Sequence, residues 1–207
     1  MVNTASRRRL SVEDRRNELM RTCLSLIGTQ PWDEISMAAI ADAAGVSKPL
    51  LYHYFSTKSD LYLAAVQSAA LELSVATLPD VTLPVPRRLL EALEAHVDWV
   101  DQHANAYRAI LHGGLSSNAE VQAIVERSRV EVVYRIAGTY ALDAQSPLQR
   151  IAIRGWIGFL ESACIDWLGA RDISKVQLVR LLASSLPAAL GAVEDREGLD
   201  LALRLRS

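Results

Sequence analysis

Hydrophobic residues recur along most of this chain at the three- and four-residue spacing of an amphipathic helix, and strand-like alternation is nearly absent. Helix-start signals precede several of these stretches, including Ser11 with Asp14 and Thr57 with Asp60. The pattern therefore predicts an all-α protein. The long helices that we expect run from Ser11 to Ile27, from Thr57 towards Ala76, from about residue 118 to Tyr140, from Pro147 to Gly169 and onward from Ser174.

Proline interrupts this helical pattern in two places. The stretch from Leu78 to Pro86, LPDVTLPVP, contains three prolines and predicts the clearest loop in the chain. Pro187 falls inside the last helical pattern, where its missing amide predicts either a kink or an interruption of the helix.

The segment from Ile35 to Leu61 predicts two short helices joined by a tight turn. Gly45 follows an apolar run and can end the first helix, because glycine adopts a left-handed conformation at little cost. Ser36 and Ser47 each stand where a side chain can cap the helix that follows. The arrangement predicts a helix-turn-helix. The N-terminal end and outer face of its second helix, which can enter the major groove of DNA, carry Lys48, Pro49, Leu50, Tyr52 and His53.

An alternative interpretation is that the run LLYHYF, residues 50–55, is ordinary core with one partly exposed histidine. Charge placement favours DNA reading, because lysine occurs only at Lys48, Lys58 and Lys175, and two of these lie in this segment. The cluster Arg7 to Arg9 ahead of it can enter the minor groove, or it can be a solvated chain end. With a net charge of only −2 for the whole chain, the DNA-binding hypothesis depends on local charge placement.

The sequence GVSKPLLYHYFSTKSDL, from Gly45 to Leu61, resembles the DNA-binding motif of the tetracycline-repressor (TetR) family of bacterial transcription regulators nearly end to end. The resemblance implies an N-terminal three-helix DNA-binding domain, taken as residues 1–60, and a larger helical domain for ligand binding and dimerisation, taken as residues 61–207. It implies phosphate contacts from Ser36, Ser47, Tyr52 and Lys58. It implies contacts with bases or sugars from Lys48, Pro49, Leu50 and His53.

Pro49 departs from the family pattern, since many members carry glycine or a small polar residue there. The contact implied at this position is therefore apolar, with a thymine methyl group as the expected partner.

The last two predicted helices have few polar faces. Residues 150–169, RIAIRGWIGFLESACIDWLG, are apolar around most of the helix axis and must be covered on both sides. A chain of 207 residues has too few elements for this, so we expect a homodimer through these two helices. The alternative is that both helices are the core of a monomer. A twofold dimer would also place two recognition helices about one duplex turn apart on a palindromic site.

Aromatic and weakly polar residues between the helix that leaves the motif and the last two helices can line a cavity for a small molecule. Alternatively, they are ordinary core. We expect an apolar or aromatic effector, and the family resemblance implies that its binding moves the linking helix and changes the spacing of the recognition helices. The polar groups that we expect to orient it are His96, His103 and Glu161. The expected ligand-binding residues are Trp99, His103, Tyr107, Tyr134, Trp156 and Phe159.

The sequence contains no motif that is typical of an enzyme, a metal site or a membrane span. The chain contains no GxSxG, GxGxxG, HExxH or phosphate-loop motif, and no cysteine–histidine cluster with zinc spacing, so we expect no catalysis, no metal and no cofactor. Cys23 and Cys164 are far apart and predict buried, reduced thiols. No secretory signal or membrane span is evident, which predicts a cytoplasmic protein.

These features predict a ligand-responsive transcriptional regulator. We expect a repressor that binds a palindromic DNA operator as a homodimer and is released by a small apolar or aromatic effector. The alternative is a helical ligand-binding or scaffolding module without DNA binding.

Overall fold

A computed structural model of the chain describes residues 11–27, 29, 32–112 and 118–194. All regular secondary structure in these ranges is helical, which confirms the predicted all-α fold. The arginine cluster Arg7 to Arg9, for which a minor-groove contact was one possibility, lies outside the described residues.

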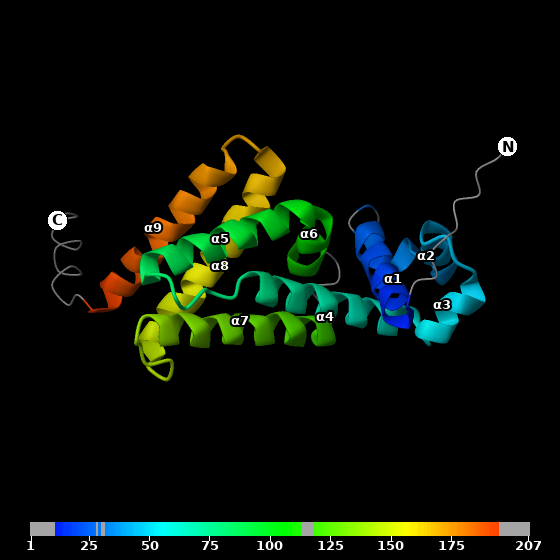
Figure 1. Cartoon of the computed structure of the whole chain (residues 1–207), viewed down its shortest axis with the longest axis horizontal. Helices are drawn as coiled ribbons and strands as arrows, with labels where there is room; N and C mark the ends of the chain where they lie inside the picture. The colour runs from blue at the N-terminus through cyan, green and yellow to red at the C-terminus, as the bar shows by residue number, and fades with distance from the viewer. Residues whose placement is uncertain (1–10, 28, 30–31, 113–117, 195–207) are drawn as a thin grey trace.

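The helices form two groups at opposite ends of an elongated molecule (Figure 1). The N-terminal group consists of α1 (Val12–Ile27), α2 (Met37–Ala43) and α3 (Lys48–Tyr54), with the short 3-10 helix η1 (Trp32–Glu34) before α2. The other group consists of α5 (Val85–Gln102), α6 (Ala104–His112), α7 (Ala119–Thr139), α8 (Pro147–Ala170) and α9 (Lys175–Glu194). This arrangement matches the expected small helix-turn-helix domain and larger helical domain.

Helix α4 (Lys58–Ala76) runs from one group into the other. It packs against α1 on one side and against α5 and α7 on the other, and α6 also contacts α1. The N-terminal group is therefore connected to the larger group through α4 and also through the contact of α6 with α1. The boundary between residues 60 and 61, which falls in the first turn of α4, stays a prediction.

Three helices begin with side-chain caps at the positions predicted from the sequence. The Ser11 hydroxyl accepts a hydrogen bond from the Asp14 amide (3.0 Å) at the start of α1. Thr57 and Asp60 form a reciprocal capping box at the start of α4, and the Asn118 side chain caps α7. These three predicted helix starts are confirmed.

The structure tests the predicted loop from Leu78 to Pro86 and the predicted effect of Pro187. Val85 and Pro86 already lie in the first turn of α5, so the predicted loop from Leu78 to Pro86 was two residues too long. Proline is tolerated there because the amides of the first helical turn have no helical partner. Helix α9 continues through Pro187, so this proline does not interrupt the helix.

The apolar faces of all these helices meet in a continuous core, in which none of the described polar or charged residues is buried. Cys23 and Cys164 are both buried and free, as expected. Burial raises the pKa of each thiol to about 12, so both stay protonated at neutral pH.

Candidate nucleic-acid interface and ligand cavity

The turn between α2 and α3 depends on Gly45, whose φ angle is 63°. The Gly45 amide donates to the Asp42 carbonyl oxygen (3.0 Å), and the Val46 amide donates to the Ala41 carbonyl oxygen (2.9 Å). Together these bonds form a Schellman end of α2. A residue with a Cβ adopts this φ at a cost, so glycine sets the angle at which the chain enters α3. The predicted helix-turn-helix is confirmed.

Helix α3 is anchored on one side and exposed on the other. The Ser47 hydroxyl accepts a hydrogen bond from the Leu50 amide (3.3 Å), and Leu51 is fully buried beneath the helix. Leu50 and Tyr52 are 38% and 45% exposed, so the alternative that residues 50–55 are ordinary core is wrong for this face. The side chains exposed together are Lys48, Pro49, Leu50, Tyr52 and His53.

The exposed residues carry both polar and apolar groups that suit DNA. The Lys48 ammonium lies 5.9 Å from the centre of the Tyr52 ring, which steadies it on the outer surface. The hydroxyl of Ser36 accepts from the Ala39 amide (3.1 Å) at the start of α2. Ser36 and Ser47 act as acceptors in these caps, which leaves each O–H able to donate to a phosphate.

Lys58, which was predicted to contact a phosphate, already has partners within the protein. Its ammonium donates to the carbonyl oxygens of Trp32 and Ile35, at 2.7 Å each, and lies 4.2 Å from the centre of the Trp32 ring. An ammonium has three N–H groups, so at most one remains for DNA. The described geometry makes Lys58 a tie between η1 and the start of α4, a role that the sequence did not indicate.

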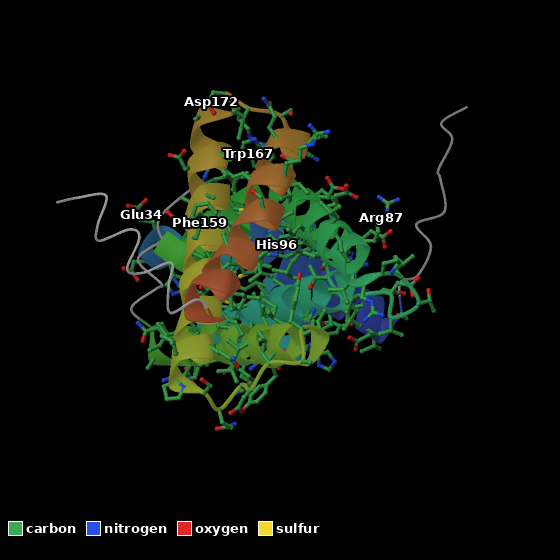
Figure 2. All side chains as sticks on the ribbon, turned by 90° about the vertical axis from the view of Figure 1, so that its left-hand side faces the viewer. Glu34, Arg87, His96, Phe159, Trp167 and Asp172 are labelled. Atoms are coloured by element: carbon green, nitrogen blue, oxygen red, sulfur yellow. The ribbon has the colours of Figure 1, made fainter. Side chains whose placement is uncertain are left out.

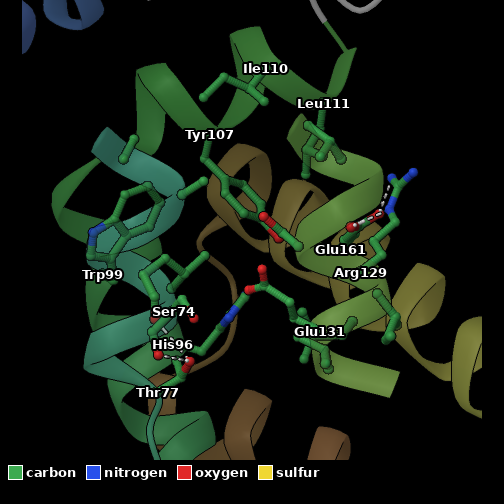
Figure 3. A pocket seen from close by; sticks show the side chains of 18 of the residues that line it. Ser74, Thr77, His96, Trp99, Tyr107, Ile110, Leu111, Arg129, Glu131 and Glu161 are labelled. Atoms are coloured by element: carbon green, nitrogen blue, oxygen red, sulfur yellow. Dashed lines mark hydrogen bonds and ion pairs between the residues drawn. The ribbon is translucent and has the colours of Figure 1, made fainter. Parts of the chain in front are cut away.

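A cavity of about 910 Å³, including space open to solvent, lies among α4, α5, α6, α7 and α8 (Figure 3). Most of its wall is aliphatic or aromatic. The apolar wall includes Val66, Leu73, Trp99, Tyr107, Ile110, Leu111, Val132, Trp156 and Leu160. Its mainly apolar lining with a few polar groups matches sites that bind small organic molecules.

Three of the six predicted ligand-binding residues line this cavity, namely Trp99, Tyr107 and Trp156. Trp99 donates from its indole nitrogen to Glu72 (3.1 Å). Trp156 donates to the Leu182 carbonyl oxygen (3.2 Å) and is thereby held against α9. The indole rings are therefore fixed parts of the wall.

The other three predicted residues do not line this cavity, and a role for them in ligand binding stays a prediction. His103 stacks on Trp99, with ring centres 4.4 Å apart, and its Nε2 lies 3.6 Å from Glu72. Tyr134 is 54% exposed, and its hydroxyl accepts a hydrogen bond from Gln145 (3.3 Å). Phe159 is 40% exposed on α8. The helical spacing in the sequence indicated helices that surround the cavity, but it did not indicate which face of each helix points into it.

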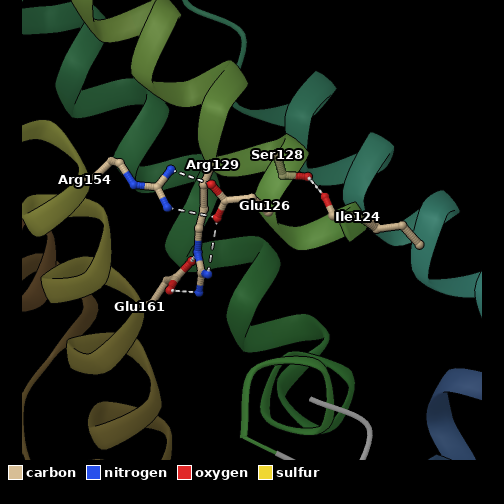
Figure 4. A network of polar contacts seen from close by, with 6 residues as sticks. All are labelled: Ile124, Glu126, Ser128, Arg129, Arg154 and Glu161. Carbon is tan, nitrogen blue, oxygen red and sulfur yellow. Dashed lines mark hydrogen bonds and ion pairs between the residues drawn. The ribbon is translucent and has the colours of Figure 1, made fainter. Parts of the chain in front are cut away.

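Charged residues beside the cavity form ion pairs between α7 and α8 (Figure 4). Arg129 donates two hydrogen bonds to Glu161, at 2.9 and 2.7 Å, and Arg154 donates two to Glu126, at 2.7 and 2.9 Å. Hydrogen bonding to Glu161 raises the pKa of Arg129, and hydrogen bonding to Arg154 lowers the pKa of Glu126.

Arg135 of α7 was not singled out from the sequence, although it lines the cavity. Its guanidinium donates to the Thr77 carbonyl oxygen (3.1 Å) and to the Ser74 hydroxyl (3.2 Å) at the C-terminal end of α4. Burial lowers the pKa of Arg135, yet an arginine stays charged at any physiological pH. The linking helix is thus tied to the cavity wall at its last turn.

Two polar atoms in the cavity wall, His96 Nε2 and the Tyr107 hydroxyl, are buried without a hydrogen-bond partner. His96 as a residue is partly accessible, but Nε2 is not part of the accessible surface. The Tyr107 hydroxyl interacts with the Cys164 thiol, which is too weak a hydrogen-bonding group to satisfy it. A buried polar group without a partner costs about 1–3 kcal/mol, so these atoms mark a place where a ligand can bind.

Within the described ranges, no helix is long and apolar enough to cross a membrane. Nor do those residues contain a group of three or more histidine, cysteine or acidic side chains that could hold a metal ion.

Two family models match this chain. The model described as bacterial regulatory proteins of the tetR family matches residues 19–65, and the one described as the tetracyclin repressor-like C-terminal domain matches residues 85–189. The chain therefore belongs to the TetR family of bacterial transcriptional regulators and has a helix-turn-helix DNA-binding domain.

Individual relatives agree with this assignment. The chain is 32% identical to the HTH-type transcriptional activator FasR of Mycolicibacterium smegmatis over 61% of this chain and 64% of FasR, slightly less than two thirds of that protein. It is 31% identical to the HTH-type transcriptional regulator BetI of Rhizobium meliloti over 82% of this chain and 83% of BetI. A TetR-family regulator structure from Streptomyces coelicolor is similar over 95% of this chain and 97% of that one, with 30% identity and a TM-score of 0.75.

Proposed function

We propose that this chain is a homodimeric repressor that binds a palindromic operator and leaves it when a small, mainly apolar effector occupies the cavity. The observation that carries this proposal is the exposed face of α3, which is anchored by Leu51 and capped by Ser47. Such a helix can enter the major groove as a rigid unit. The relatives and structural neighbours, which are regulators and not enzymes, support the same class of activity.

The contacts that we propose follow from chemistry and exposure. Lys48 and His53 carry nitrogen groups that can reach base edges, and Pro49 and Leu50 offer apolar contact to thymine methyl groups. Phosphates are contacted by Ser36, Ser47 and Tyr52, with a minor contribution from the remaining N–H of Lys58.

Dimerisation is supported by the outward faces of α8 and α9, which run side by side on one face of the molecule (Figure 2). One stripe of exposed positions on α8 recurs at helical spacing and is uncharged: Leu148, Ile151, Gly155, Phe159 and Ser162. On α9 the equivalent exposed positions are Leu181, Ser184, Ala188 and Gly191. An added Cβ at Gly155 or Gly191 would meet nothing within 4 Å in the single chain. Such apolar and small-residue stripes fit the close packing of a four-helix interface between two copies.

Coupling between the cavity and DNA is supported by two helices. Helix α4 contributes Val66 and Leu73 to the cavity wall and packs on α1, and α6 contributes Tyr107 and Ile110 and also packs on α1. A ligand that fits one arrangement of α4 and α6 better than another changes the population of the DNA-binding arrangement.

Selection of binding sites from randomised duplex DNA tests this proposal. We expect a palindromic site whose half-sites are about one duplex turn apart, or a small multiple of that. Light scattering of the complex should give a protein dimer, or a multiple of dimers, on each site. Enrichment of no sequence would instead favour a helical ligand-binding module without DNA binding, and a monomer on an unrepeated site would contradict the proposed assembly.

Repression has its own test, since FasR is named an activator. A reporter promoter that carries the selected operator should be less active when the chain is expressed. Scrambling one half-site should restore its activity. Higher reporter activity on expression of the chain would contradict repression while leaving DNA binding intact.

A further inference from the structure

The unpartnered atoms His96 Nε2 and Tyr107 Oη belong to one part of the cavity wall. Tyr107 projects from α6 into the cavity (Figure 3), and its ring meets the His96 ring edge to face, with ring centres 6.1 Å apart. The surrounding wall is mainly apolar. A ligand group that enters beside these rings can therefore offer a hydrogen bond to one or both of these atoms.

The charges of the cavity wall are already compensated by protein groups. Arg129 and Glu161 satisfy each other through two hydrogen bonds, and Arg135 is engaged by Ser74 and Thr77. Glu131 is the remaining acidic residue of the wall, and its charge acts on Arg135 as the opposite charge. Burial lowers the pKa of His96 to about 4, so at neutral pH this ring adds no charge.

A charged ligand head would find the charges of the wall already engaged with each other. A carboxylate beside His96 and Tyr107 would meet a neutral ring and a hydroxyl, and the nearby arginines would have to leave their own partners. A cation would compete with Arg129 for Glu161 or with Arg135 for Glu131. In each case the cost of removing the ligand charge from water is not offset.

We propose that the effector is an uncharged, mainly apolar molecule whose hydroxyl or carbonyl group hydrogen-bonds His96 Nε2 and Tyr107 Oη. This inference rests on the proposed function, because it names the ligand class of the same cavity. A hydroxyl both donates and accepts, so it suits either tautomer of the histidine.

Three probes that share one apolar chain and differ in head-group charge test the ligand class: 1-decanol, decanoate and decyltrimethylammonium. Trp99 and Trp156 line the cavity, so their fluorescence reports occupancy of the full-length protein. We expect 1-decanol to bind at least about tenfold more tightly than either charged probe. Binding of a charged probe with equal or higher affinity would overturn the inference.

Variants test the two polar atoms. Tyr107→Phe removes only an oxygen atom whose partner in the free protein is the weakly bonding Cys164 thiol, so folding should be retained. It should weaken 1-decanol binding by about three- to tenfold, and His96→Phe should cause a loss of similar size. Tyr62→Phe is the matched control, since the Tyr62 hydroxyl is also buried without a partner but lies outside the cavity wall. Unchanged affinity in both cavity variants would overturn the assignment.

A gel shift with the selected operator separates this inference from the proposed function. Release of DNA by 1-decanol supports both. Selective binding of 1-decanol that depends on Tyr107 but leaves operator affinity unchanged supports the ligand class and contradicts ligand-responsive regulation. Release of DNA by decanoate, without discrimination against charge, supports regulation and overturns the ligand class.

Discussion

Arg135 of α7 donates hydrogen bonds from one guanidinium nitrogen to the carbonyl oxygen and to the hydroxyl oxygen of Thr77, each at 3.1 Å. Thr77 is the C-cap of α4, where the last carbonyls have no partner within the helix. A positive charge at this end is also favourable to the helix dipole. With the Thr57 and Asp60 capping box at its start, α4 is held at both ends.

Replacing Arg135 by alanine should lower the free energy of unfolding by about 1–3 kcal/mol, because partly buried carbonyl groups lose their donor. Urea denaturation measures this change. Arg154→Ala is the matched control, since Arg154 joins Glu126 in a pair whose side chains are 33% and 47% exposed. Such exposed pairs contribute about 0–1 kcal/mol. Equal losses in both variants would contradict the capping role of Arg135.

Lys48 and Lys58 should respond to alanine substitution in different ways. Lys58→Ala should lower the free energy of unfolding by about 1–3 kcal/mol, because the carbonyl groups of Trp32 and Ile35 lose their donor. Lys48→Ala should leave the urea midpoint unchanged and alter base preference in a binding-site selection.

Lys175→Ala is the control for these lysine variants, since Lys175 pairs with Asp98 and Asp101 and is 43% exposed. It should change stability by less than about 1 kcal/mol. If Lys58 mainly contacts a phosphate, Lys58→Ala should instead keep wild-type stability and bind all DNA sequences more weakly. The slope of log affinity against log salt concentration should then be smaller by about one unit. That result would restore the phosphate role that the sequence predicted.

Local features of this fold were predictable, whereas contacts between helices were not. Gly45, Ser47 and the Thr57 cap act within a few residues of themselves, so sequence spacing alone identified their roles. Arg135 meets Thr77 across 58 positions of the chain, and Arg129 meets Glu161 across 32. Such pairs depend on how far one helix is shifted and rotated against another, which helical periodicity does not specify.

The same limit explains the cavity. Periodicity indicated that residues such as Trp156 and Phe159 lie on an apolar helix, but this helix has more than one apolar face. Trp156 faces inward and Phe159 faces outward. Packing against α7 and α9 decides which face of α8 turns to the cavity. The second apolar face of α8 is the reason for the dimer hypothesis.

Gly45 should be intolerant of even a small side chain. Gly45→Ala should lower the free energy of unfolding by about 1–2 kcal/mol, because its φ of 63° is unfavourable for a residue with a Cβ. Gly138→Ala is the matched control, since Gly138 lies within α7 and an added Cβ would meet nothing within 4 Å. It should stabilise the protein by about 0.5–1 kcal/mol. Thermal denaturation of both variants should shift in opposite directions, and a shift of the same sign would contradict this account of the turn.

Phe159 should be necessary for the dimer and not for the fold. Phe159→Glu places a charge on the exposed stripe of α8, where the side chain is 40% exposed in the single chain. Burial of an unpaired carboxylate in an interface is unfavourable, so light scattering at micromolar concentration should give a monomer mass. Tyr134→Glu alters an aromatic side chain that is 54% exposed on α7, and it should leave the dimer mass unchanged. A dimer mass for Phe159→Glu would place the interface elsewhere.

Acid should destabilise this protein in part through His96. Burial lowers the pKa of His96 from 6.5 to about 4 in the folded chain, so between these values the unfolded chain binds a proton that the folded chain does not. The neutral ring therefore contributes its full stability above pH 6.5, and this contribution is lost as the pH falls towards 4. In urea denaturation at several pH values, His96→Phe should flatten the acid side of the stability curve by about 1 kcal/mol per pH unit. If the free energy of unfolding changed with pH in the same way for the wild type and His96→Phe, His96 would be protonated in the folded state as readily as in the unfolded chain.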